Sequence, residues 1–65
     1  MNIRLNGEDV DFNGSNVHDV IIFYKLKPES VVVEKNGEIV HREKYAEENI
    51  KDGDVIEIVR FVGGG

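Results

Sequence analysis

Four dipeptides of the type Asn-Gly or Asp-Gly divide this chain of 65 residues into short segments, and they limit its fold more than any other feature. They are Asn6-Gly7, Asn13-Gly14, Asn36-Gly37 and Asp52-Gly53. Because Asn, Asp and Gly tolerate a positive φ, we expect a tight turn at each of them. No long linker or internal repeat separates these turns. The sequence therefore predicts one small domain built from short elements.

Strand patterns surround the first and the third of these dipeptides. Apolar side chains alternate with polar ones on both sides of the first, and β-branched residues lie on both sides of the third. Each pattern is typical of an antiparallel hairpin with one buried face. Residues 55–62 carry the longest β pattern and predict a fifth strand. In the polar segment before it, we expect Tyr45 and Ile50 to anchor a short helical turn in the core.

One helix is expected between the two hairpins. Apolar residues recur from Val17 to Tyr24 at the spacing of a single helical face, and Asn16 precedes them as a candidate N-cap. Lys25 and a second lysine near the end suit the helix macrodipole, and Pro28 is expected to stop the helix. Together these elements predict an α+β fold, a mixed five-stranded sheet with one main helix packed across it.

The two faces of the final strand are expected to differ. Ile56 and Ile58 share one face, whereas Val59 and Phe61 share the other. If the isoleucines face the helix, Val59 and Phe61 lie on the open face of the sheet and form a candidate partner-binding surface. The alternative is that the twisted end of the strand packs Phe61 against a neighbour, since single exposed apolar residues are common.

The charge balance excludes several classes of partner. Thirteen acidic and eight basic residues give a net charge of -5 and an isoelectric point near 4.8. This charge repels phosphate backbones and anionic lipids, so neither nucleic acid nor a membrane is an expected partner. The first residues lack the pattern of a signal peptide, which predicts a cytoplasmic protein. Cysteine is absent, which excludes disulfides and thiol chemistry on the chain.

No catalytic or metal-binding constellation stands out in the sequence. His18 and His41 have no second ligand at metal-binding spacing, and Ser15 and Ser30 lie outside any nucleophile-elbow motif. The acidic residues at 52–54 lack the alternating oxygen ligands of a calcium loop, so a turn explains them better. We therefore predict that the chain is not an enzyme and holds no metal or cofactor of its own.

The chain ends in three glycines, Gly63-Gly64-Gly65. We expect the α+β domain to span residues 1–62 and a flexible tail to follow over residues 63–65. A tail without side chains can enter a narrow cleft of a partner enzyme, and its terminal carboxylate is sterically bare. If the partner supplies Mg-ATP, the carboxylate can attack the α-phosphate and become an acyl-adenylate. The alternative is an inert, frayed terminus.

The sequence as a whole resembles the thiamin-biosynthesis sulfur carrier protein family (ThiS), which belongs to the ubiquitin-like β-grasp sulfur carriers. The resemblance covers all 65 residues. It rests on Asn6-Gly7, Val17-His18-Asp19-Val20, Val31-Val32-Val33-Glu34, Asn36-Gly37-Glu38-Ile39-Val40, Arg42, Asp52-Gly53-Asp54, Ile56-Glu57-Ile58 and the final Gly64-Gly65. The chain departs from the family pattern at His41, where proline is frequent, and at Tyr45, where tryptophan is frequent. The fold that this resemblance implies is the ubiquitin-like β-grasp.

For Gly65 the resemblance implies a chemical role. An E1-like adenylating enzyme would activate its carboxylate with Mg-ATP, and a sulfur donor protein would supply the sulfur that makes it a thiocarboxylate. Thiazole synthase would then use this sulfur to build the thiazole ring of thiamin. Gly64 and Gly63 would provide the slim approach to the partner's active site. The lack of cysteine agrees with this chemistry, because the sulfur must come from elsewhere.

Two other interpretations of the sequence remain open. One is a related carrier, such as the small subunit of molybdopterin synthase or a carrier for another sulfur acceptor, although the molybdopterin family usually has a longer chain. The other is a ubiquitin-like module that binds its partner through the sheet and has an inert tail. Removal of Gly64 and Gly65 separates the two classes, because only a carrier would lose its function.

Overall fold

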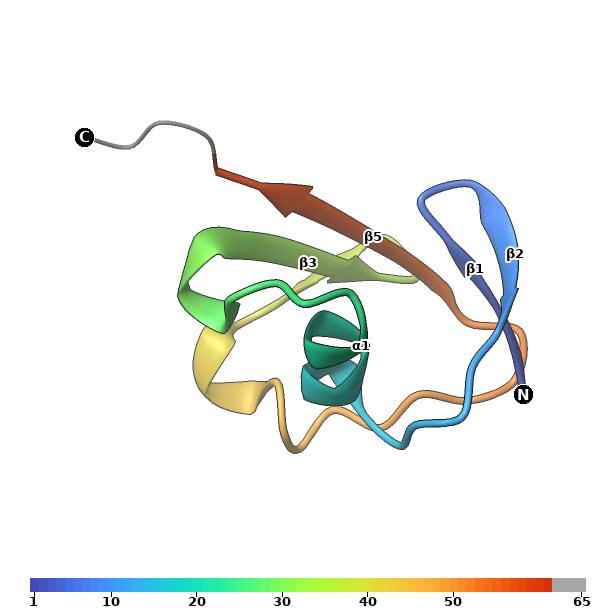
Figure 1. Cartoon of the computed structure of the whole chain (residues 1–65). Helices are drawn as coiled ribbons and strands as arrows, with labels where there is room; N and C mark the ends of the chain where they lie inside the picture. Colours follow the sequence, from blue (N-terminus) through green and yellow to red (C-terminus); the bar gives the residue numbers. More distant parts are fainter. Residues whose placement is uncertain (62–65) are drawn as a thin grey trace.

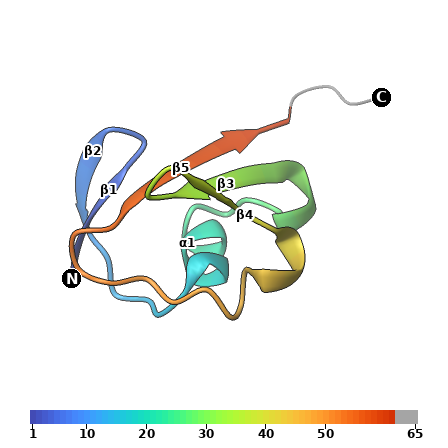
Figure 2. The same ribbon diagram turned by 180° about the vertical axis from the view of Figure 1, so that it is seen from behind.

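A computed structural model describes residues 1–61 of the chain, which form a mixed five-stranded sheet with one helix across it (Figure 1). The strands are β1 (Asn2–Leu5), β2 (Glu8–Asp11), β3 (Val31–Lys35), β4 (Glu38–Val40) and β5 (Val55–Arg60). The helix is α1 (Val17–Phe23), and two short 3-10 turns are η1 (Pro28–Ser30) and η2 (Arg42–Lys44). Figure 2 shows η2 following the β3–β4 hairpin. The predicted α+β architecture is confirmed.

The last strand lies at the centre of the sheet, whose order is β2-β1-β5-β3-β4. β5 pairs antiparallel with β3 over five residue pairs, from Val31↔Arg60 to Lys35↔Ile56. It pairs parallel with β1 over only two, Arg4↔Val55 and Leu5↔Ile56. β2 and β4 complete the two hairpins at the edges. Among residues 1–61, the first half of β5 therefore has a strand on both sides, whereas its second half pairs with β3 alone.

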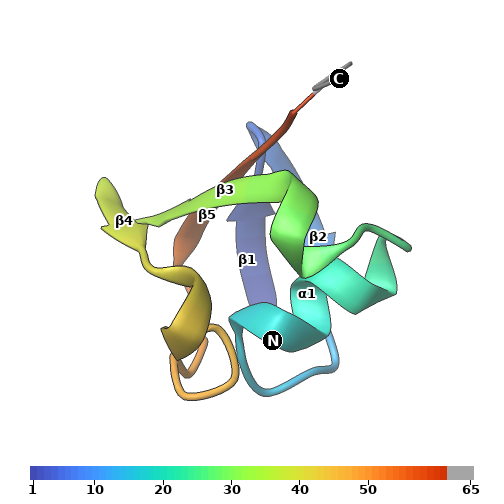
Figure 3. The same cartoon turned by 90° about the vertical axis from the view of Figure 1, so that its left-hand side faces the viewer.

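The core lies between α1 and the inner face of the sheet (Figure 3). As predicted, alternate residues of β5 face it: Ile56 is fully buried, and Ile58 packs partly against the core. Tyr45 and Ile50 anchor the irregular segment as expected, and the Tyr45 hydroxyl donates a hydrogen bond to the Val31 carbonyl at 3.2 Å. Burial raises the pKa of this hydroxyl above its ordinary value of 10.0.

The start of α1 follows the sequence prediction. The side-chain oxygen of Asn16 accepts a hydrogen bond from the Asp19 amide at 2.9 Å. The Asp19 carboxylate accepts in return from the amide of Asn16 at 3.3 Å and from that of Ser15 at 2.8 Å. This reciprocal capping box satisfies amide groups that the first turn of a helix leaves without partners.

The end of α1 differs from the prediction, because the helix stops at Phe23, well before Pro28. Lys25 has a φ of 59°, in the left-handed region, and its amide donates to the Ile22 carbonyl at 2.9 Å. The amide of Leu26 donates to the Ile21 carbonyl at 3.0 Å. These two bonds form a Schellman motif, in which Tyr24 is the C-cap and Lys25 is the residue after it. Lys25 therefore lies beyond the last helical turn. The prediction that basic residues occupy the end of the helix is wrong, because the last turn of α1 contains none.

Lys25→Gly is expected to raise the free energy of unfolding by about 0.5–1 kcal/mol. A left-handed residue costs roughly 1–2 kcal/mol when it has a side chain, and the greater freedom of glycine in the unfolded chain offsets part of that gain. Urea unfolding followed by circular dichroism measures the change. Lys27→Gly is the matched control, because Lys27 has an extended backbone with a φ of -101°. If Lys25→Gly and Lys27→Gly lower the free energy of unfolding by the same amount, the left-handed backbone of Lys25 is not significantly strained.

One of the four predicted glycine turns is wrong. Gly7, Gly37 and Gly53 have positive φ values of 84°, 85° and 89°, as expected of tight turns. Gly14 does not lie in a turn, and its φ is not positive. A Cβ atom at Gly14 would collide with the Phe12 ring and lie 2.8 Å from the Cβ of Asp19. Glycine is needed here so that the backbone can pass close to a buried aromatic ring.

Candidate partner-binding site at the end of β5

Two asparagines hold β5 in place from its two sides. The Asn36 side-chain oxygen accepts from the Val55 amide at 2.9 Å, and the Asn36 amide donates to the Val55 carbonyl at 2.7 Å. On the other side, the Asn6 side-chain oxygen accepts from the Ile58 amide at 2.8 Å, and the Asn6 amide donates to the Ile56 carbonyl at 2.9 Å. Each asparagine therefore both makes its own turn and fixes the central strand.

Sequence reasoning found these asparagines but not their second role. Asn6 and Asn36 both have a positive φ, of 49° and 52°, which the turn signal predicts. Their side chains bond residues 52 and 19 positions away, and nothing in a local pattern reports such contacts. The signal in the sequence that could have indicated this role is the asparagine side chain, which can accept and donate hydrogen bonds at the same time.

The carboxylate of Asp54 supports the start of β5. It accepts from the Asn36 side-chain amide at 3.0 Å and from the Lys51 backbone amide at 2.8 Å. Partial burial opposes ionisation, but these hydrogen bonds and the nearby lysines outweigh it and lower the pKa of Asp54 below its ordinary value of 3.8. The ionised form is therefore the one that the folded state prefers.

Asp54 is expected to make the fold sensitive to acid. Because its pKa is lower in the folded chain than in the unfolded chain, its stabilisation is complete above the ordinary value of 3.8 and is lost as the pH falls through the folded pKa. The free energy of unfolding of the natural chain, measured from about pH 6 to about pH 2, should fall more steeply than that of Asp54→Asn. Parallel curves for the two proteins would contradict this role.

The candidate partner-binding residues Val59 and Phe61 lie on the open face of the sheet, opposite α1. Their exposed fractions are 63% and 59%, so the alternative that Phe61 packs against a neighbour is wrong. The Phe61 amide donates to the Ser30 carbonyl at 2.8 Å, which fixes the backbone while the ring faces solvent. Val32 lies directly opposite Val59 in the register with β3. These three residues form an apolar strip at the end of β5.

Acidic residues lie beside this apolar strip. Glu34 and Glu57 are directly opposite one another on β3 and β5, and Glu34 is also opposite Ile39 on β4. Ile39 has 61% of its surface exposed. Like charges in opposite positions destabilise a sheet, so this pairing does not serve the fold. The open-face patch therefore consists of Val32, Glu34, Ile39, Glu57, Val59 and Phe61.

The other sites that the sequence predicts or excludes concern the final glycines and the titratable groups. Gly63, Gly64 and Gly65 lie outside the residues that the structure describes, as does the expected domain boundary at residue 62. Within residues 1–61 no group of three or more His, Asp or Glu side chains is placed to hold a metal ion. In the same part of the chain, no helix is long and apolar enough to cross a membrane.

The comparisons with known proteins agree with this geometry. The sequence model of the ThiS family matches residues 2–65. The chain belongs to the ThiS family. ThiS membership accounts for the fold as well: the crystal structure of the thiamine biosynthesis protein ThiS from Geobacter metallireducens superposes with a TM-score of 0.81 at 38% identity, and the match covers 100% of both chains.

Two curated relatives bear on what this ThiS protein does. The sulfur carrier protein ThiS of Bacillus subtilis (strain 168) is 45% identical over 65 residues, which cover 97% of this chain and 98% of that protein. The thiazole synthase of Paramagnetospirillum magneticum is 38% identical over 66 residues, which cover 100% of this chain but 20% of that enzyme. The chain is a ThiS-type sulfur carrier of thiamin biosynthesis, and a segment like it occurs within a much longer thiazole synthase.

Proposed function

We propose that the carboxylate of Gly65 carries the sulfur. An E1-like adenylating enzyme binds the chain and Mg-ATP, and a carboxylate oxygen attacks the α-phosphate and displaces pyrophosphate. Sulfide (HS⁻) released by a donor protein then attacks the carbonyl of the acyl-adenylate, and AMP leaves, so that the product is a thiocarboxylate. The carrier supplies the carboxylate and the recognition surface, and its partners supply the catalytic groups. We place this cycle in the cytoplasm.

The observation that carries this proposal is the match of residues 2–65, which include the final glycines, to the ThiS family model, together with the 45% identity to a sulfur carrier protein. The exposed apolar strip supports it, because only Val62 separates Phe61 from Gly63-Gly64-Gly65 in the sequence. A partner that covers this strip is in position to receive the glycines. The glycine residues 63–65 lack Cβ atoms, so partner backbone can close around them.

Thiazole synthase is the proposed acceptor of the sulfur. The support is the thiazole synthase of Paramagnetospirillum magneticum, a fifth of which aligns with this whole chain. When two proteins occur in one polypeptide, they are held at a high effective concentration, which is useful only if they interact. For separate chains the same interaction must come from complementary surfaces.

The acidic part of the open-face patch suggests the charge of the adenylating partner. Glu34 and Glu57 lie beside the apolar strip, and the chain carries a net charge of -5. A basic groove on the partner would relieve the repulsion between the two glutamates and steer association. The association rate should therefore fall as the salt concentration rises.

Phe61→Ser is expected to weaken binding to the adenylating enzyme by roughly 10- to 30-fold, because exposed aromatic residues at the centre of an interface often contribute about 2 kcal/mol. Phe23→Ser is the matched control: Phe23 is 61% exposed but lies on α1, on the other side of the sheet. Titration calorimetry measures both affinities. If the two variants lose the same amount of affinity, the open-face patch is not part of the interface.

The first chemical step can be tested directly. The adenylating enzyme is incubated with radiolabelled pyrophosphate, Mg-ATP and the carrier, and the exchange of label into ATP is measured. We expect exchange only when the carrier is present, since its carboxylate is the nucleophile. Exchange that does not depend on the carrier would refute adenylation at Gly65. The same holds if no exchange occurs with an enzyme that activates another ThiS protein.

A further inference from the structure

The second half of β5 has an open edge on the side of β1, although β5 is the central strand of the sheet. β1 pairs with β5 only as far as Leu5↔Ile56, and the chain then turns away at Asn6 (Figure 1). The Asn6 side chain accepts from the Ile58 amide, and this is the last hydrogen bond that the β1–β2 hairpin gives to β5. Among residues 1–61, no strand continues along this side of β5 beyond that point.

The backbone groups left at this edge can be identified. Hydrogen bonds alternate along a strand, so a residue that bonds one neighbour does not bond the other. On the β3 side, Val55 of β5 bonds Asn36, and Phe61, the residue after β5, bonds Ser30. On the β1 side they are Ile56 and Ile58. By this alternation the carbonyl of Ile58 and the amide and carbonyl of Arg60 point to the side from which β1 is missing.

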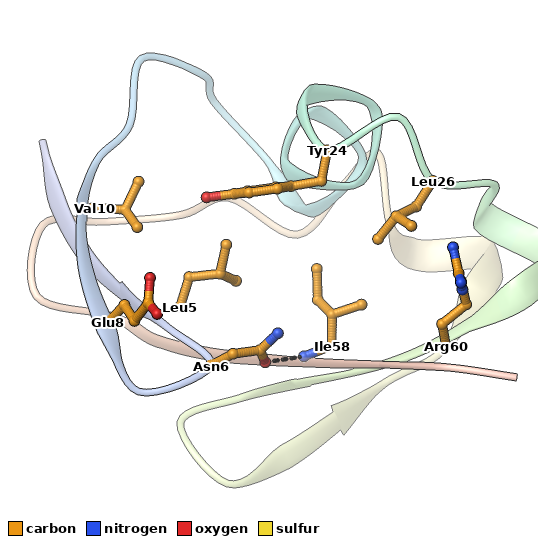
Figure 4. Close-up of a pocket in the computed structure, with 8 residues that line it drawn as sticks. All are labelled: Leu5, Asn6, Glu8, Val10, Tyr24, Leu26, Ile58 and Arg60. Atoms are coloured by element: carbon orange, nitrogen blue, oxygen red, sulfur yellow. Dashed lines mark hydrogen bonds between the residues drawn. The ribbon is translucent and has the colours of Figure 1, made fainter.

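An open pocket of about 410 Å³ lies beside this edge (Figure 4). Its apolar residues include Leu5, Leu26 and Ile58, whereas Glu8 lies at one end and Arg60 at the other. Within residues 1–61 neither Glu8 nor Arg60 forms a salt bridge. Among the described residues, the edge thus combines backbone groups that face no neighbouring strand, an apolar hollow and two opposite charges.

We propose that an extended segment of thiazole synthase adds to this edge of β5 as a further strand, a step that rests on the proposed function. One residue of that segment accepts a hydrogen bond from the Arg60 amide and donates one to the Ile58 carbonyl. In parallel orientation this repeats, two residues further along β5, the bonds that Asn6 makes with Ile56 and Ile58. Strand addition of this kind takes its affinity from main-chain bonds and its specificity from alternate side chains.

The pocket defines the chemistry of the added segment. Its inward side chain is apolar and fills the space between Leu26 and Ile58. An acidic residue lies near Arg60, and a basic residue lies near Glu8, so that both charges are paired. Gly65 is the fifth residue after Arg60, which is at most ~18 Å of extended chain, so the enzyme that receives Gly65 is within reach of this edge.

Amide hydrogen exchange of the natural chain tests the proposal. Carrier labelled with ¹⁵N is exchanged alone and in complex with unlabelled thiazole synthase, and the exchange is then quenched and read by NMR. We expect the Arg60 amide to exchange at least about tenfold more slowly in the complex, because an amide hydrogen-bonded across an interface is protected. An unchanged Arg60 exchange rate in a saturated complex would overturn the proposal.

A pair of variants separates the backbone from the side chain of Arg60. Arg60→Pro removes the outward amide but no bond to β3, and proline is tolerated at a strand edge. Arg60→Ala removes the same side chain and keeps the amide. We expect Arg60→Pro to bind thiazole synthase roughly three- to tenfold more weakly than Arg60→Ala, as the loss of one hydrogen bond predicts. Equal affinities would overturn the proposal. Should Arg60→Pro fail to fold, the exchange measurement on the natural chain still decides.

Two further outcomes have fixed meanings. Concentration-dependent protection of Arg60 in the carrier alone would assign the edge to a second copy of the chain and overturn the proposal. Failure of the intact protein to gain sulfur with a competent adenylating enzyme and a sulfur donor would refute the proposed function. That result would leave a protected Arg60 amide as evidence of strand addition.

Discussion

Ile21→Ala is expected to lower the free energy of unfolding by about 2–5 kcal/mol, the usual cost of removing a buried isoleucine side chain. Ile21 is fully buried on the inner face of α1, where it belongs to the hydrophobic core cluster. Ile22, the next residue, is 50% exposed and provides a matched control in the same helix. Ile22→Ala should change stability by no more than about 0.5 kcal/mol.

Urea unfolding followed by circular dichroism measures both variants, since the chain has no tryptophan for a fluorescence assay. A core of this size rarely supplies more than about 3–5 kcal/mol, so Ile21→Ala can unfold the chain. It would then abolish function without any effect on the binding site. If the two alanine variants are equally stable, α1 does not pack as described.

Deletion of Gly64 and Gly65 is expected to abolish carrier-dependent pyrophosphate exchange while the free energy of unfolding stays the same. The reason is that the elements and the core described for residues 1–61 do not include either residue, whereas the proposed nucleophile is the carboxylate of Gly65. A chain of 65 residues can also be made synthetically with a C-terminal amide, which keeps every residue and removes only the carboxylate. This amide form should bind the adenylating enzyme and give no exchange.

Full activity of the deletion variant would contradict the carrier chemistry and favour a ubiquitin-like module that binds through its sheet. Activity of the amide form would contradict only the role of the carboxylate, because the glycine tail would still be present. The two proteins thus separate the need for a tail from the need for its carboxylate.

The parts of the fold that the sequence predicted are those set by local periodicity. Alternation in the last strand correctly placed Ile56 inside and Val59 and Phe61 outside, because side chains on a strand have a period of two. The N-cap at Asn16 was also predicted from a local pattern, and its partner Asp19 is only three residues away. Local contacts can be derived from local patterns.

The predictions that failed depend on contacts that no local pattern contains. The helix ends before Lys25 because a left-handed residue lets Leu26 turn back onto the core, and Pro28 has no part in this. Gly14 was predicted as a turn, but its role depends on the position of the Phe12 ring. At the site, Phe61 followed from periodicity, whereas the open edge at Arg60 required the order of the strands.

The measurement that tests the central claim most directly is the intact mass of the carrier after incubation with its adenylating enzyme, Mg-ATP and a sulfur donor. We predict a gain equal to the difference between sulfur and oxygen, located by fragmentation at Gly65. Addition of thiazole synthase with its other substrates should return the mass to its starting value. An unchanged mass with a competent partner, or sulfur found on any residue other than Gly65, would contradict the account.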